Sequence, residues 1–208
     1  MRALLIILLV SLLQGCMTPQ HANLDAFYAH QPRSILVVPV VNESPEVTAN
    51  SVFITSITQP LAEHGYYVFP VYLTDMILRD FGLVEAGHIH QLPTERFYEL
   101  FGADAVLFIT IKDWSTKYLV VASSVVVSME YVLKDTRTGQ VLWKNDQGFV
   151  QQSGGGDLIS MTVSAAINAL VTDYLPLARQ ANLLAFLPPK GIPVGPYHPQ
   201  YQKDKDQF

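Results

Sequence analysis

The chain is poor in cysteine and in charged residues, and both shortages limit what it can be. It has 208 residues, of which one is a cysteine and 15% are charged, and its net charge is −5. A single cysteine excludes an intramolecular disulfide and a zinc site built from several thiolates. An acidic chain without a basic run is a poor match for nucleic acid, because such binding depends on neutralising phosphates. We therefore expect one domain with an ordinary core and no nucleic-acid partner.

The N-terminus carries an apolar run of eleven residues, Ala3–Leu13, in which Ser11 is the only polar residue. As a helix this run would rise about 16 Å, too little for the roughly 30 Å hydrocarbon core of a bilayer. It follows Arg2 and precedes the small residue Gly15, which is the layout of a secretory signal peptide over residues 1–15. A buried core helix is the alternative, but a segment that is apolar on every face favours the signal peptide.

The one cysteine directly follows this segment. Leu13-Gln14-Gly15-Cys16 resembles a bacterial lipobox, with an aliphatic residue three positions before the cysteine and a small one directly before it. Gln14 departs from the small or aliphatic residue usual at its position. The resemblance implies cleavage before Cys16 and attachment of three acyl chains to that residue. Two membrane signals are enough for stable anchoring, so three acyl chains would anchor the protein stably. An aspartate after the cysteine would imply retention in the inner membrane. Met17 stands there instead, which implies delivery to the outer membrane, facing the periplasm or exposed on the cell surface.

Residues 34–111 predict an alternation of strands and helices. Three apolar, β-branched stretches have the composition of buried strands, namely Ser34–Val41, Tyr66–Val71 and Ala105–Ile111. Three stretches between them have helical spacing, namely Asn50–His64, Thr74–Phe81 and Thr94–Gly102. Pro60 is expected to kink or restart the first helix, and Thr74 and Thr94 are expected to cap the other two. Residues 83–93 are expected to be irregular.

Beyond the third strand, the pattern changes from uniformly apolar to alternating. From Val125 to Lys134 apolar and polar residues alternate, which places one set on one face of a sheet. Turn residues at Asp135–Gly139 and the stretch Gln140–Lys144 complete an antiparallel hairpin, and Gly148–Gln152 is a candidate for a third antiparallel strand. The order of elements predicts an α/β (α+β) fold with a mixed sheet and a packed C-terminal helix.

Residues 34–187 are expected to form the single domain, between two extensions. Helical spacing begins at Asp157, resumes at Pro176 and ends near Phe186. Residues 16–33 show little apolar periodicity and predict a lipidated tether. Five of the 13 prolines lie in residues 188–208, so this end is predicted to be an extended tail rather than a packed element.

Motifs of catalysis are missing from the sequence. No nucleophile elbow, zinc-protease motif or Walker loop occurs in it. His88 and His90 are too few ligands for a metal, and we interpret them as exposed loop residues. Asp104, Asp113 and Asp135 lie at strand ends, where carboxylates cap turns more often than they act as acids or bases. We therefore predict no catalytic residue, no metal and no cofactor.

Tyrosines give the best indication of a binding surface. Tyr66, Tyr67, Tyr72 and Tyr197 lie at predicted strand ends or in the tail. Tyrosine often anchors protein interfaces, because its ring is apolar and its hydroxyl can form hydrogen bonds. Ordinary packing in the core or at its rim is the competing explanation for each of them. The shortage of charge in the body of the chain favours a surface that faces a partner.

Three segments together resemble a family of bacterial lipoproteins of unknown function, which includes a meningococcal vaccine-candidate surface lipoprotein. They are PLAEHGYYVFPV (Pro60–Val71), FGADAVLFITI (Phe101–Ile111) and DTRTGQVLW (Asp135–Trp143). The resemblance spans Ser34–Phe186 and implies a domain similar to the N-terminal domain of the periplasmic protein TolB. Comparable domains occur in a curli-secretion lipoprotein and in a lipoprotein activator of peptidoglycan synthases. Members of this wider group act as adapters or assembly components, and some form dimers.

These observations lead to one functional hypothesis and two alternatives. We expect a non-enzymatic outer-membrane lipoprotein whose periplasmic domain is an adapter or auxiliary component of an envelope or transport assembly. It would bind the membrane through acyl chains on Cys16 and an envelope protein through its domain, and a homodimer is left open. The first alternative is a hydrolase of envelope polymers, which needs a pocket that gathers several titratable groups. The second is a lipid carrier, which needs an internal cavity. Fold analogy alone does not decide among them.

Overall fold

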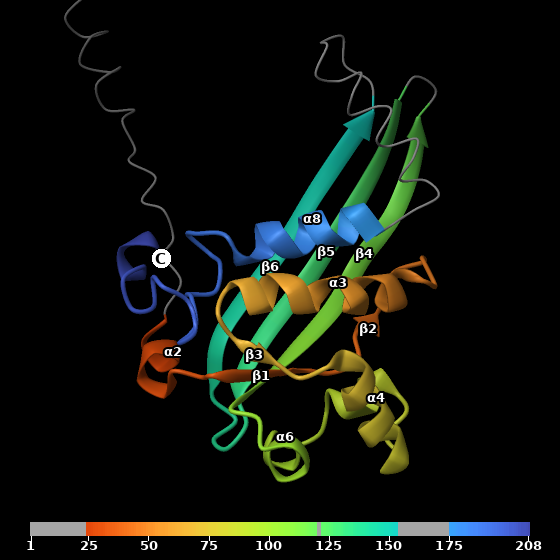
Figure 1. The fold of residues 1–208 in the computed structure, drawn as a ribbon. Helices are drawn as coiled ribbons and strands as arrows, with labels where there is room; N and C mark the ends of the chain where they lie inside the picture. Colours follow the sequence, from red (N-terminus) through yellow and green to blue (C-terminus); the bar gives the residue numbers. More distant parts are fainter. Residues whose placement is uncertain (1–23, 120–121, 154–174) are drawn as a thin grey trace, which may run out of the picture.

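The computed structural model describes residues 24–119, 122–153 and 175–208, and its centre is a six-stranded mixed sheet (Figure 1). The strands are β1 (Ser34–Val37), β2 (Val41–Asn42), β3 (Tyr67–Val68), β4 (Ala105–Leu119), β5 (Ala122–Asp135) and β6 (Val141–Ser153). Their order is β3-β1-β4-β5-β6, and β2 also pairs with β4. β1 runs parallel to β3 and β4, whereas β4, β5 and β6 are antiparallel. The predicted α/β fold is confirmed.

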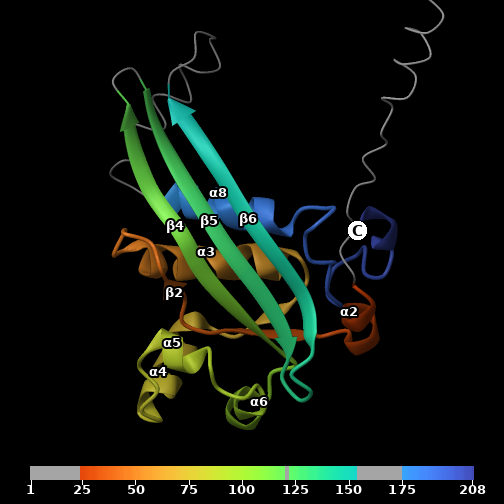
Figure 2. The same ribbon diagram turned by 180° about the vertical axis from the view of Figure 1, so that it is seen from behind.

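Helices cover both faces of the sheet and create two cores. They are α2 (Asp25–His30), α3 (Ala49–Glu63), α4 (Val71–Asp80), α5 (Ala86–Ile89), α6 (Glu95–Phe101) and α8 (Leu175–Phe186). α3 and α8 lie side by side across one face (Figure 1), where Phe53, Ile57 and Phe186 are buried. α4, α5 and α6 lie on the other side (Figure 2), where Leu78 and Phe97 pack in a second buried cluster. Within the described residues, no helix has the length and apolarity needed to cross a membrane.

Two strands extend beyond their predicted ends. β4 continues past Ile111 through a bulge at Lys112, where the register with β5 shifts by one residue. The uniformly apolar sequence stops at Ile111, but the strand does not. A change to alternating sequence is typical of a strand that is buried on one face of the sheet only. In the same way β6 continues through Gly148, which pairs with Ser128. The predicted separate strand at Gly148–Gln152 is wrong, because these residues are the second half of β6.

The helices depart from the predictions in several places, beginning with residues 83–93, which are expected to be irregular but contain α5. α6 begins after Thr94 and ends at Gly102, whose φ of 67° suits a glycine, as predicted, but the Thr94 side chain makes no capping hydrogen bond. α3 is one helix through Pro60, so the predicted restart is wrong. α4 begins at Val71, directly after Pro70, and the predicted cap Thr74 lies inside it. Pro70 also shortens the second predicted strand to Tyr67–Val68. The helix predicted from Asp157 lies outside the described residues, and its resumption at Pro176 is confirmed within α8.

The C-terminal segment is packed, and the prediction of an extended, unpacked tail is wrong. Ile192 is buried, and the backbone N–H of Gly195 donates to the carbonyl of His64 at 2.7 Å. A Cβ at Gly195 would lie 2.4 Å from the carbonyl oxygen of Gly65, so glycine allows the close approach. The buried Asp204 carboxylate accepts from the N–H of Val194 at 2.8 Å. Hydrogen bonds to loops thus hold a segment that has no periodic pattern for sequence analysis to detect.

The predicted tether also carries structure in its described part. Residues 25–30 form α2, and Leu24 and Phe27 are buried in the core. Tyr201 of the C-terminal segment donates from its hydroxyl to the side-chain oxygen of Gln31 at 3.0 Å, just after α2. Both ends of the described chain therefore meet at one end of the sheet (Figure 1). Residues 24–30 of the predicted tether therefore pack against the domain, and its earlier part lies outside the described residues.

Candidate functional site

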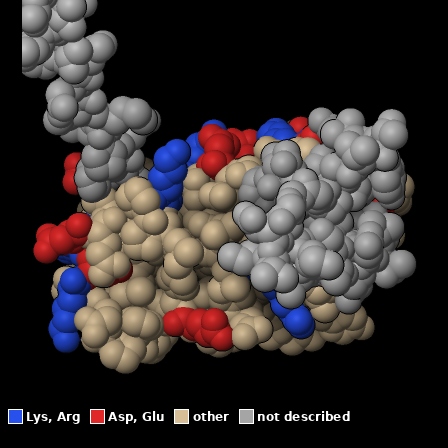
Figure 3. All heavy atoms as spheres, turned by 90° about the horizontal axis from the view of Figure 1, so that it is seen from above, with Lys and Arg blue, Asp and Glu red and all other residues tan. Residues whose placement is uncertain are grey.

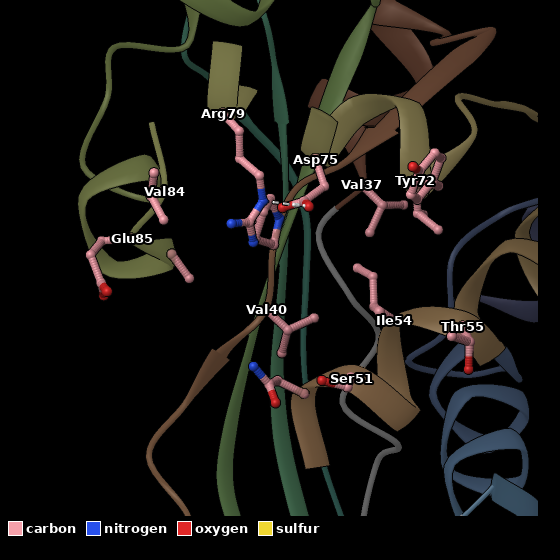
Figure 4. Close-up of a pocket in the computed structure, with 14 residues that line it drawn as sticks. Val37, Val40, Ser51, Ile54, Thr55, Tyr72, Asp75, Arg79, Val84 and Glu85 are labelled. Carbon is pink, nitrogen blue, oxygen red and sulfur yellow. Dashed lines mark hydrogen bonds and ion pairs between the residues drawn. The ribbon is translucent and has the colours of Figure 1, made fainter. Parts of the chain in front are cut away.

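An open groove of about 460 Å³ lies where β1 ends, between α3, α4 and α5. Val37 lines it from the end of β1, Pro39 and Val40 line it from the segment that follows, and Ile54 lines it from α3. Figure 4 shows Val84 and Glu85 on one side of the groove and Tyr72 on the other. Ligand sites in α/β sheets commonly lie outside the carboxyl ends of parallel strands, and the volume is that of a small-ligand or side-chain pocket.

The groove exists because β3 stops early. β3 pairs with β1 only at Ser34 and Ile35, and Pro70 then starts α4, which leaves the sheet. Beyond Ile35, the edge of β1 that β3 would pair with therefore has no strand partner. α3 and α4 stand on opposite sides of the sheet, and their facing surfaces make the walls of the groove.

An ion pair lies on the α4 wall of the groove. Nε of Arg79 donates to Oδ2 of Asp75 at 2.7 Å, one helical turn apart on α4 (Figure 4). This hydrogen bond raises the pKa of Arg79, so the guanidinium keeps its charge at any physiological pH. Because both side chains are largely solvated, the pair contributes little to stability and stays available to a ligand. In the view from above, the described surface is mainly uncharged, with acidic and basic side chains around its edge (Figure 3).

An exposed apolar surface adjoins the groove. Its members lie between residues 72 and 84 and leave between 42% and 75% of their surface in solvent: Tyr72, Leu73, Met76, Phe81 and Val84. We call these five residues the α4 surface. Large apolar residues concentrated in one segment commonly mark an interaction site. The sequence signal for it is that α4 is apolar on more of its circumference than one core-facing stripe requires.

The four candidate tyrosines occupy different environments. Tyr66 is buried and its hydroxyl donates to the carbonyl of Pro193, so its ring packs inside the protein and the prediction that it faces a partner is wrong. Burial raises the pKa of Tyr66, and the nearby Asp204 carboxylate raises it further. Tyr67, Tyr72 and Tyr197 are more than half exposed, and of these Tyr72 lines the groove. Cys16 lies outside the described residues.

The histidines and strand-end carboxylates do not line the groove. His88 is exposed, as predicted, but it lies in α5 rather than in a loop. His90 is half-buried, with Nε2 2.9 Å from the carbonyl oxygen of Pro39, so the prediction that it is an exposed loop residue is wrong. Burial lowers the pKa of His90, which outweighs the opposing effect of that hydrogen bond. Among the described residues, no group of three or more His, Cys, Asp or Glu side chains could hold a metal.

Two of the three strand-end carboxylates have structural contacts. Oδ2 of Asp104 accepts hydrogen bonds from the backbone N–H of Arg33 and Ser34, at 3.1 and 3.2 Å, and from the Ser34 hydroxyl at 3.0 Å. Oδ1 of Asp135 accepts from the backbone N–H of Arg137 and Thr138, at 3.0 and 2.8 Å. They join strands and close the hairpin turn, which is the capping role that the sequence favoured.

This role makes Asp104 testable. Asp104→Ala is expected to lower the free energy of unfolding by about 1–3 kcal/mol, because three donors at the start of β1 lose their acceptor. Urea denaturation followed by circular dichroism measures the loss. Asp113→Ala is the matched control, because within the described part of the chain no hydrogen bond of its carboxylate is found. Equal stability of the two variants would contradict the structural role.

Comparison with known proteins assigns the family. Residues 23–196 match the family described as "Putative lipoprotein GNA1162-like". The lipoprotein NMB1124/NMB1162 of Neisseria meningitidis serogroup B is 34% identical over 194 residues, which cover 88% of this chain and 90% of that protein. The crystal structure of lipoprotein GNA1162 from Neisseria meningitidis is 37% identical with a TM-score of 0.57, and the match covers 68% of this chain and all of that one. The chain therefore belongs to the GNA1162-like lipoprotein family.

Proposed function

We propose that this lipoprotein is anchored to the outer membrane through acyl chains on Cys16 and faces the periplasm. Its domain is a non-enzymatic adapter or auxiliary component of an envelope assembly. The family assignment and the lipobox sequence support the anchor. Met17 supports delivery to the outer membrane, through the lipobox resemblance described above.

The α4 surface is the observation that carries the adapter role. Its five large apolar side chains are exposed to solvent beside an open groove. Such exposure lowers solubility unless a partner covers the side chains, so it commonly marks an interaction site. The positions of Asp104 and Asp135 also support an adapter over a hydrolase, because their carboxylates are occupied by backbone donors. A lipid carrier would need an enclosed cavity, whereas the hollow beside α4 is an open groove.

The adapter role is tested by crosslinking in whole cells. A tagged full-length chain is crosslinked, purified from the outer-membrane fraction and analysed by quantitative mass spectrometry against an untagged strain. We expect one or a few envelope proteins to be enriched at least ten-fold over the untagged control. If no protein is enriched, the chain has no stable envelope partner and the adapter proposal fails.

A further inference from the structure

The floor of the groove cannot take an added strand. Val37 and Val40 are buried there, and Pro39 between them has no backbone N–H to donate. A proline at this position breaks the ladder of hydrogen bonds that a strand from another protein would need. A segment that binds here must therefore be held by its side chains, as a helix is when it lies in a groove.

The walls offer apolar contacts to such a segment. Ile54 of α3 and Val71 of α4 are partly buried and face the groove with the floor valines. Tyr72, which is 75% exposed, and Val84, which is 54% exposed, extend this apolar lining to the rim. From Tyr72 the apolar surface continues along α4 through Leu73 and Met76. This arrangement fits a ridge of apolar side chains spaced along one face of a helix.

The charges around the groove are predominantly acidic. Asp75 and Arg79 neutralise each other at 2.7 Å. Glu85 lines the groove and Asp80 lies at the end of α4, both exposed, and within the described residues neither has a counter-ion. Three carboxylates and one guanidinium therefore lie in or beside the groove, and a complementary partner carries basic residues.

We propose that this groove and the α4 surface bind an amphipathic helical segment of another envelope protein, with apolar anchors flanked by lysine or arginine. The inference rests on the proposed adapter function and names the chemistry of its partner. A second copy of this chain is disfavoured, because a two-fold interface would place the acidic Asp80 and Glu85 of the two copies against each other. An anionic lipid surface is disfavoured for the same reason.

Synthetic peptides test the proposal on the full-length lipidated protein in phosphatidylcholine nanodiscs. The first probe is a fluorescein-labelled 15-residue helical peptide with leucines at i, i+3, i+4 and i+7 and lysines beside them. The second has glutamates in place of the lysines. Fluorescence anisotropy measures binding, and empty nanodiscs give the background from lipid. Tyr197→Ala is the control for Tyr72→Ala, because Tyr197 is 67% exposed and does not line the groove.

We expect the lysine peptide to bind, and Tyr72→Ala to weaken its binding about ten-fold, as for the loss of an interface anchor. Tyr197→Ala should change it less than about two-fold. Glu85→Lys should weaken the lysine peptide and strengthen the glutamate peptide, each by a few-fold, since rim charges act weakly. These shifts separate recognition by the groove from binding to the nanodisc.

Other outcomes overturn the proposal. Binding no stronger than to empty nanodiscs would exclude a helix-binding groove, and equal binding of both peptides would exclude its charge selectivity. Self-association that Tyr72→Ala abolishes would make a second copy the occupant. Failure of the groove proposal is distinct from failure of the adapter role. If a partner is captured in cells and Tyr72→Ala does not change the captured amount, the adapter role is supported and the groove is excluded as its binding site. Conversely, selective peptide binding without any captured partner retains the groove and removes the adapter.

Discussion

Cys16→Ser is expected to remove the protein from the outer-membrane fraction, the largest effect of any single substitution in this chain. Serine lacks the thiol that receives the diacylglyceryl group, so all three acyl chains implied by the lipobox would be lost. Each buried methylene contributes about 0.8 kcal/mol, and one chain alone gives only marginal binding whereas two or more anchor stably. Loss of the anchor should therefore be close to complete rather than graded.

Separation of inner and outer membranes on a sucrose gradient, followed by immunoblotting, measures this result. Mass spectrometry of the N-terminal peptide provides a second readout, because the wild type should begin at an acylated Cys16. Thr18→Ala is the control, since it alters the same segment and leaves Leu13–Cys16 intact. Retention of Cys16→Ser in the outer membrane at the wild-type level would mean that something other than lipid holds the protein there.

The sequence predicts the elements whose signals are local. Gly102 ends α6 because a left-handed glycine acts within one helical turn. The turn at Asp135–Gly139 forms for the same reason, with Asp135 bonded to the N–H groups that follow it. Packing of the C-terminal segment depends instead on contacts more than a hundred residues away, such as Tyr66 with Pro193. No periodicity within the segment encodes such a contact.

The groove illustrates the same limit. Tyr72 was identified as an interaction candidate from the sequence, and it lines the groove. The groove itself arises because β3 ends at Val68 and leaves the far end of β1 without a strand partner on that edge, which the pattern of residues in β1 does not reveal. Tyr66 and Tyr67 are neighbours in sequence, yet Tyr66 is buried just before β3 and Tyr67 is exposed at its first position.

A buried polar network joins three elements and supports the second prediction of large effect. Asn182 of α8 is fully buried, and its Nδ2 donates to the hydroxyl oxygen of Ser56 on α3 at 2.8 Å. Its Oδ1 accepts from the hydroxyl of Tyr131 on β5 at 3.2 Å. Burial raises the pKa of Tyr131 well above its usual value, so the phenol stays protonated and remains a donor. The network fixes α8 and α3 against the sheet.

Asn182→Ala is expected to destabilise the protein by about 3–4 kcal/mol. The Tyr131 hydroxyl keeps only the weak acceptor Sδ of Met129 at 3.7 Å, a loss of about 1–3 kcal/mol. The Ser56 oxygen loses a donor, although its hydroxyl still donates to the carbonyl of Phe53, and the smaller side chain leaves a void. For a chain of this size, that loss lowers the melting temperature by about 10 °C. Differential scanning calorimetry measures the shift. Gln180→Ala on the exposed face of the same helix is the control and should change stability by less than about 0.5 kcal/mol.

A double substitution separates the hydrogen bonds from the packing. Tyr131→Phe removes the donor that Asn182→Ala leaves unsatisfied, so the double variant should be more stable than the sum of the two single losses predicts. Coupling of about 1 kcal/mol or more would show that the two side chains act through their hydrogen bond. Strict additivity would show instead that Asn182 contributes only volume, and the network would then have no part in holding α8 against the sheet.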